Sequence, residues 1–264
     1  MLRLPLVIVD CHCHAGIGDG LTGPWDTEAH LGRYLARAAR AGIDRTVVFA
    51  AFHSDYAVAN RQVARIVHRS RGRLYGFAFV HAARDAGRVL ALVREAVERH
   101  GFRGIKVHRH DARITREVCE AARRFGVPVL YDPYAEMGPV ELVAAEYPDV
   151  RFIIPHMGSF ADDWMAQVAM IGMLMRHDNL YIDTSAIRRF DLLQEAAHRR
   201  PRRVLFGSDG PYLHPGLELE KVRLLGLRPG DEHRVLGGNV LQLLEPVQRA
   251  RAGGTTGRRM SSPR

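Results

Sequence analysis

Short apolar runs alternate along the chain with longer stretches in which apolar positions recur every three or four residues. A short, continuous apolar run is typical of a strand buried on both faces of a parallel sheet. The runs predict eight strands, over residues 6–15, 46–52, 74–80, 104–108, 128–132, 151–156, 180–185 and 203–209. The stretches between and after them predict helices over residues 28–41 (with Thr27 as N-cap), 56–70, 85–100, 115–125, 139–146, 163–175, 190–198, 217–225 and 231–244.

The regular alternation of strands and helices predicts an α/β fold with a parallel sheet. Eight units within roughly 250 residues favour a single (β/α)₈ TIM-type barrel with C-terminal helices. No Gly-x-Gly-x-x-Gly follows the first strand, which argues against an open sheet that binds a dinucleotide. We therefore expect one barrel domain over residues 1–248, and a disordered basic tail over residues 249–264.

The first strand ends in an unusual alternation of polar groups. Side chains of an extended strand alternate between two faces, so Asp10, His12 and His14 are expected to share one face and Cys11 and Cys13 the other. Two imidazoles two residues apart at a strand end can converge on one cation. The alternative is a strand end with two histidines facing solvent. We predict a metal site, with both cysteines packed against a neighbouring helix.

Further polar residues follow the other predicted strands. Eight of the 14 histidines lie at or just beyond strand ends, where the active sites of such barrels are found. In ring order, the candidates after the first strand are His53, His81, Lys106, His108, His110, Asp132, His156, Asp183, Asp209 and His214. Of these, His53 and His214 are expected to contact substrate. Arg188, in the region after the seventh predicted strand, is expected to bind a substrate carboxylate or face solvent. Asp183 is expected either to cap the turn after its strand or to serve the site.

Charge and cysteine content narrow the class of protein. The net charge is +9, but five arginines of residues 249–264, with no acidic residue, supply more than half of it. We therefore expect no nucleic-acid partner. Three cysteines are too few for a disulfide framework. With no signal peptide and no apolar run of about 20 residues, the chain is expected to be soluble and cytoplasmic, with no membrane partner.

Lysine is almost absent from the chain. Lys106 and Lys221 are the only lysines among 38 basic residues. A cation at Lys106 is therefore expected to need something that arginine cannot provide, such as a shifted pKa or carboxylation. Lys106 is on this ground a candidate catalytic residue.

Five motifs, in this order along the chain, resemble the amidohydrolase superfamily. They are Asp10-Cys-His-Cys-His14, Gly104-Ile-Lys-Val-His108, Ile154-Pro-His-Met-Gly158, Leu205-Phe-Gly-Ser-Asp-Gly-Pro211 and the closing Val235-Leu-Gly-Gly-Asn-Val-Leu-Gln-Leu-Leu244. The branch that they resemble is that of the amidohydrolase-related metal-dependent hydrolases, which also contains aminocarboxymuconate-semialdehyde-type decarboxylases and pyrone-type lactonases.

The resemblance implies roles for several residues. It makes His12 and His14 ligands of a divalent metal, usually zinc, and Asp209 a ligand, a proton acceptor or both. It makes His156 a group that orients substrate or joins the metal. One position departs from the family pattern, because Asp132 stands where a histidine ligand is usual. Either Asp132 binds the metal itself, or His108 takes that place, or the chain is a metal-free member.

These observations predict a metal-dependent hydrolase of a small molecule, acting on an amide, lactone or other C–N or C–O bond. A metal-activated water would attack, and Asp209 would move its proton. The alternatives are a non-oxidative decarboxylase of a small aromatic or enoic acid, and a metal-free barrel that binds without catalysis. A homo-oligomer is compatible with the sequence.

Overall fold

Nine strands form the sheet at the centre of the molecule. The computed structural model describes residues 7–22, 27–160 and 163–245. The strands are β1 (Val9–Ile17), β2 (Glu28–Ala29), β3 (Arg45–Ala50), β4 (Leu74–Phe79), β5 (Gly104–His108), β6 (Val129–Asp132), β7 (Phe152–Ile154), β8 (Leu180–Asp183) and β9 (Val204–Leu205). Their order is β2-β1-β3-β4-β5-β6-β7-β8-β9, and every pair except β1–β2 is parallel. The predicted parallel α/β fold is confirmed.

The sheet curls until its first and last parallel strands meet. The backbone N–H of Cys11 donates to the carbonyl of Phe206 at 2.9 Å, and that of His14 donates to the carbonyl of Gly210 at 2.6 Å. Cys13 and Gly210 form a parallel bridge. The segment that follows β9 therefore lies beside β1, as a TIM-type barrel requires.

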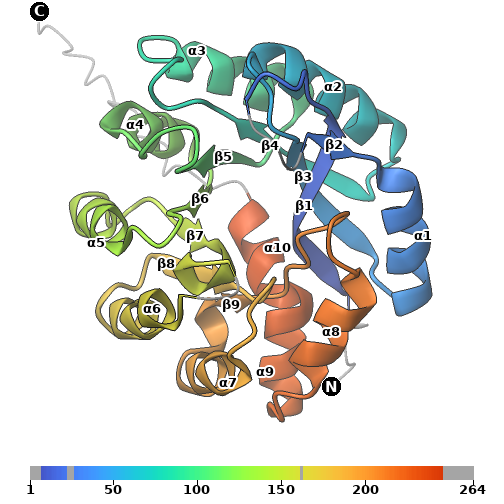
Figure 1. The fold of residues 1–264 in the computed structure, drawn as a ribbon, viewed down its shortest axis with the longest axis vertical. Coiled ribbons are helices and arrows are strands. Elements are labelled where there is room, and N and C mark those ends of the chain that lie inside the picture. The colour runs from blue at the N-terminus through green and yellow to red at the C-terminus, as the bar shows by residue number, and fades with distance from the viewer. Residues whose placement is uncertain (1–6, 23–26, 161–162, 246–264) are drawn as a thin grey trace, which may run out of the picture.

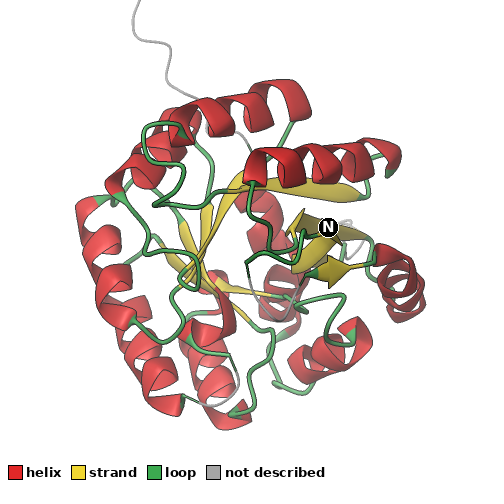
Figure 2. Ribbon diagram, turned by 45° about the horizontal axis from the view of Figure 1, so that its top comes forward, coloured by secondary structure: helices red, strands yellow, loops and turns green. Residues whose placement is uncertain are grey.

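Helices surround the strands, and α1 to α8 follow one another around them in chain order (Figure 1). They are α1 (Leu31–Ala41), α2 (Tyr56–Arg69), α3 (Val89–Arg94), α4 (Arg116–Phe125), α5 (Met137–Glu146), α6 (Trp164–Arg176), α7 (Phe190–Arg199), α8 (Pro215–Arg223), α9 (Pro229–His233) and α10 (Asn239–Leu244). Figure 2 shows this outer layer of helices around the central strands. The arrangement leaves the carboxyl ends of the strands and their loops to build a site.

The helix predicted over residues 28–41 is wrong at its start. Glu28 and Ala29 pair antiparallel with Ile17 and Gly16 of β1, and α1 begins only after His30. Thr27 is therefore not the N-cap. Two other predicted helices are interrupted. Residues 85–100 contain α3 followed by the π-helix Glu95–Arg99, and residues 231–244 contain the π-helix Arg234–Gly238 between α9 and α10.

Two strand glycines allow aromatic rings to lie directly against the sheet backbone. A Cβ on Gly76 would lie 2.4 Å from the ring of Phe102, and a Cβ on Gly104 would lie 2.4 Å from the ring of Phe77. Both rings are fully buried.

No helix in the described ranges is long and apolar enough to cross a membrane. The expected tail, residues 249–264, lies outside the described residues, so the domain boundary at residue 248 stays a prediction.

Candidate active site

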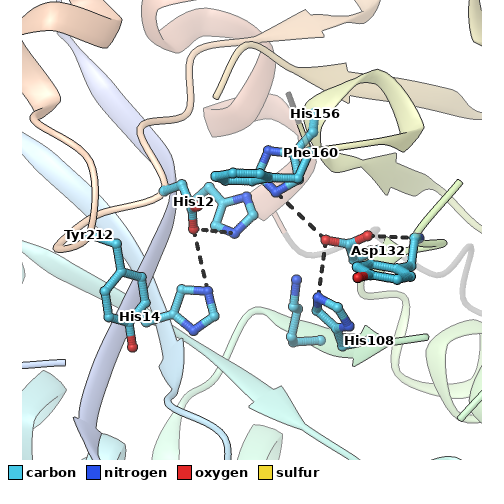
Figure 3. Close-up of a pocket in the computed structure, with 10 residues that line it drawn as sticks. His12, His14, His108, Asp132, His156, Phe160 and Tyr212 are labelled. Atoms are coloured by element: carbon cyan, nitrogen blue, oxygen red, sulfur yellow. Dashed lines mark hydrogen bonds and ion pairs between the residues drawn. The ribbon is translucent and has the colours of Figure 1, made fainter. Parts of the chain in front are cut away.

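A cavity of about 390 Å³ lies among the strand ends. Its described lining comes from β1, β5 and β6 and from the loops after β6, β7 and β9. The lining residues are His12, His14, Lys106, His108, Asp132, Tyr134, His156, Phe160, Asp209 and Tyr212. Seven of them were candidates from the sequence alone, so the strand-end reasoning located this cavity. Figure 3 shows His12 and His14 on one side of it and His108 with Asp132 on the other.

Asp209 lies against both histidines of β1. Its Oδ1 is 3.3 Å from Nε2 of His12 and 3.5 Å from Nε2 of His14. All three residues are buried. Burial raises the pKa of Asp209, although His12, His156 and Lys106 oppose the rise. His12 and His14 thus share one face of β1, as the alternation predicted, and both face the carboxylate of Asp209.

Asp183 fixes the orientation of His12. Its Oδ2 lies 2.7 Å from Nδ1 of His12, which donates the hydrogen bond to this carboxylate. Nε2 is then the nitrogen with a lone pair, and it faces Asp209. Burial lowers the pKa of His12 to about 4, although Asp183 opposes the change. His12 is therefore a neutral imidazole held in the tautomer that a metal ligand needs.

His156 is held by the loop that follows β8. Its Nδ1 lies 3.0 Å from the carbonyl of Ser185, and its backbone N–H donates to Asp183 Oδ1 at 3.1 Å. Its φ is +56°, in the left-handed region that favours glycine. Burial opposes protonation, but Asp132, Asp183 and Asp209 outweigh it and raise the pKa of His156.

The donor atoms of this side of the cavity fit a divalent metal. His12, His156 and Asp209 each offer one ligand atom, and these atoms all lie within 4.8 Å of one another. Two imidazole nitrogens and a carboxylate oxygen are a common ligand set for catalytic zinc. His14 adjoins the set through Asp209. The cluster contains His156, for which the sequence analysis kept two roles open: metal ligand or substrate-orienting group.

Asp132 bridges two histidines on the other side of the cavity. Its Oδ2 lies 3.2 Å from Nε2 of His108 and 3.6 Å from Nε2 of His156. Its Oδ1 accepts a hydrogen bond from the backbone N–H of Tyr134 at 2.9 Å. Burial opposes ionisation, but His108 and His156 hold the pKa of Asp132 well below its usual range. Whether Asp132 or His108 also binds metal stays a prediction.

Lys106 is fully buried and reaches the cavity from β5. Its Nζ lies 4.9 Å from the centre of the Phe49 ring, a distance at which the ring stabilises a cation. Its charge acts on Asp132 and Asp209, where it favours the ionised carboxylates. The inward direction expected for Lys106 is thus observed.

Three predicted substrate contacts do not line the described cavity. His53 accepts a hydrogen bond from the N–H of Asp55, and His214 accepts one from the N–H of Gly216 at the start of α8. Arg188 is exposed in the loop between β8 and α7. Their contact with substrate stays a prediction.

Sequence reasoning missed two features of the site. The hydrogen bond from His12 to Asp183 joins residues 171 positions apart, and only the strand order brings them together. The aromatic residues Tyr134, Phe160 and Tyr212 also line the cavity. Each lies within four residues of a strand-end candidate, which is a signal that the sequence contained.

Comparison with known proteins places this geometry in a family. The family model described as amidohydrolase matches residues 9–245. A comparison with curated sequences finds no match. Among solved structures, 5-carboxyvanillate decarboxylase LigW from Sphingomonas paucimobilis is 14% identical, with a TM-score of 0.70 over 91% of this chain and 99% of that one.

Two further structures show the range of chemistry on this fold. The putative 2-pyrone-4,6-dicarboxylic acid hydrolase from Pseudomonas putida is 20% identical, with a TM-score of 0.68 over 91% of this chain and 98% of that one. The dihydroxybenzoic acid decarboxylase from Polaromonas sp. JS666, with bound manganese, is 16% identical, with a TM-score of 0.67 over 90% of this chain and 96% of that one. The match to the family model over nearly all of the described residues confirms the resemblance of the motifs, and this chain belongs to the amidohydrolase family.

Proposed function

We propose that the protein is a metal-dependent hydrolase that cleaves a C–O or C–N bond of a small molecule. The observation that carries the proposal is the position of the Asp209 carboxylate, 3.3 and 3.5 Å from the Nε2 atoms of His12 and His14. A general base and metal-ligating nitrogens in one buried cluster are what hydrolysis by an activated water needs.

The metal would be held by His12, His14, His156 and Asp209, with zinc as the proposed ion. When bound, such an ion lowers the pKa of water towards neutrality and polarises a substrate carbonyl. Asp183 keeps Nε2 of His12 available by occupying its Nδ1. The presence of manganese in the Polaromonas relative makes that ion the first alternative to zinc.

The chain's own residues would carry the proton transfers. Asp209 would accept a proton from water and deliver it to the leaving group, because its carboxylate lies in the same buried cluster as the histidines. Lys106 lines the same cavity and would supply positive charge for the developing oxyanion. Asp132 holds His108 beside the substrate space.

Non-oxidative decarboxylation is the second candidate, favoured by the named decarboxylases among the similar structures. In that reaction Asp209 or His156 would protonate a carbon atom after carbon dioxide leaves. The lining by Tyr134, Phe160 and Tyr212 suits a planar ring, which both reactions can accommodate.

The test combines elemental analysis with a substrate panel. We expect about one divalent metal per chain, loss of metal in His12→Ala, and loss of turnover with much of the metal retained in Asp209→Asn, because an amide cannot accept a proton from water. Release of alcohol or amine supports hydrolysis, whereas release of carbon dioxide supports the second candidate. Full turnover after exhaustive chelation, with no metal detected, would show that the metal-dependent mechanism is wrong.

A further inference from the structure

A fully buried carboxylate, Asp10, lies outside the lining of the cavity. It accepts four hydrogen bonds. Two come from backbone N–H groups, of His12 at 3.1 Å and of Ser208 at 2.9 Å. The other two come from hydroxyl groups, of Tyr34 at 2.6 Å and of Ser208. One carboxylate thus binds the strand that carries the histidines and the residue directly before Asp209.

Ser208 links Asp10 to Gly210, the residue that follows Asp209. While its hydroxyl donates to Asp10, the same oxygen accepts a hydrogen bond from the N–H of Gly210 at 3.2 Å. Both neighbours of Asp209 are therefore fixed by one network. Thr46 forms the outer end of the network, since its hydroxyl lies 2.9 Å from that of Tyr34.

The backbone conformation of Asp209 must be stabilised by neighbouring residues. Its φ is +53°, in the left-handed region that aspartate rarely adopts. A residue keeps this conformation only where its surroundings fix it. Glycines on either side allow the close approach that does so. A Cβ on Gly210 would lie 2.4 Å from the Tyr34 ring, and one on Gly207 would lie 3.1 Å from the side chains of Asp183 and His12.

We propose that Asp10, acting through Ser208, is the positioning residue that sets the Asp209 carboxylate against His12 and His14. Asp10 itself touches neither substrate nor metal. The inference rests on the proposed metal site and deepens it, because it says what holds the last ligand in place. The sequence placed Asp10 on the same face as His12 and His14, whereas in the structure its carboxylate binds backbone N–H and hydroxyl groups.

The decisive variant is Ser208→Ala, which removes the hydroxyl that serves both Asp10 and Gly210. We expect cobalt(II) affinity, titrated through the visible absorption of the cobalt-loaded full chain, to fall roughly 10- to 100-fold with a changed spectrum. Asp10→Asn is expected to act in the same direction, because its amide nitrogen would face hydroxyl groups that now donate to a carboxylate oxygen.

Thr46→Val is the matched control. It removes a buried hydroxyl whose hydrogen-bond partner in this network is the hydroxyl of Tyr34. If the network only stabilises the barrel, Thr46→Val and Ser208→Ala will lower the melting temperature and leave the cobalt spectrum and affinity unchanged. That result would overturn the inference. A changed spectrum and weaker cobalt binding in Ser208→Ala alone supports it.

A crystal structure of metal-free Ser208→Ala separates this inference from the proposed function. We expect Asp209 Oδ1 to leave its present positions, 3.3 and 3.5 Å from the two imidazoles. An unmoved carboxylate overturns the positioning role, whatever the wild-type protein binds. Failure of the wild-type protein to bind cobalt would instead count against the proposed metal-dependent function.

Discussion

Replacing Asp183 with asparagine should reverse the tautomer of His12. Oδ1 of Asp183 accepts three hydrogen bonds, from the N–H of Ser185 at 3.1 Å, its hydroxyl at 2.6 Å and the N–H of His156 at 3.1 Å. Oδ2 accepts one, from Nδ1 of His12 at 2.7 Å. An asparagine side chain has one oxygen and one NH₂ group, and the NH₂ group cannot accept.

The structure decides which way the amide turns. An NH₂ group at the Oδ1 position would break three hydrogen bonds, and at the Oδ2 position it would break one. At about 1 kcal/mol for each bond, the second orientation is favoured by roughly 2 kcal/mol, or about 30-fold. The NH₂ group then donates to Nδ1 of His12, so the proton of the imidazole moves to Nε2. A protonated Nε2 cannot bind a metal.

We therefore expect Asp183→Asn to weaken zinc binding by roughly 10- to 100-fold, or about 1.4–2.7 kcal/mol. Competition with a chromophoric chelator measures the affinity, and the ¹⁵N shifts of the His12 ring report the tautomer. Asp85→Asn is a suitable control, because Asp85 is also buried and accepts from the N–H of His81, away from the cavity. Zinc affinity within twofold of wild type, with Nδ1 of His12 still protonated, would refute the reasoning.

Five further substitutions test three separate parts of the structure. Lys106→Arg should cost far more kcat/KM than Lys221→Arg, because Lys106 is fully buried and a guanidinium is larger; equal activity would remove the special role of lysine. Gly76→Ala should lower the free energy of unfolding in urea by roughly 1–3 kcal/mol, because its Cβ would lie 2.4 Å from an aromatic ring. Gly32→Ala, with nothing within 4 Å in helix α1, should instead gain about 0.5–1 kcal/mol. Asp132→His should retain or raise the metal content found by elemental analysis, since imidazole is a preferred zinc ligand; loss of metal would show that the carboxylate itself is needed.

The strands were predictable because their signal is local. Residues buried on both faces of a parallel sheet are mostly apolar over the whole run, and β4, predicted over residues 74–80, spans Leu74–Phe79. The pairing of Glu28 and Ala29 with β1 was not predictable, because two residues carry no periodicity. The two π-helices were not predicted for a related reason, because one extra residue in a turn barely changes the amphipathic pattern of a helix.

The site was predictable as a set of strand ends and less so as a set of contacts. The barrel fold alone predicts that His12, His156 and Asp209 lie at one cavity. In the structure their ligand atoms lie within 4.8 Å of one another. Asp10 was expected on the same face as His12, but the register of β1 against β3 shifts between Asp10 and Cys13. Its carboxylate accordingly binds Ser208 and Tyr34. A register shift of this kind depends on the neighbouring strand, which no local pattern records.

The meeting of β1 with the segment after β9 has a consequence for how the whole molecule unfolds. β9 has only two residues, so few backbone–backbone hydrogen bonds join the last strand and the segment after it to the first. His12 and Asp209 stand on opposite sides of this seam. An ion bound to both would act as a cross-link between segments nearly 200 residues apart in the chain, and would restrict the unfolded state as a long-range disulfide does. Hydrogen exchange should then slow around the entire ring when metal is added, with the largest change at the backbone N–H groups of Cys11 and His14.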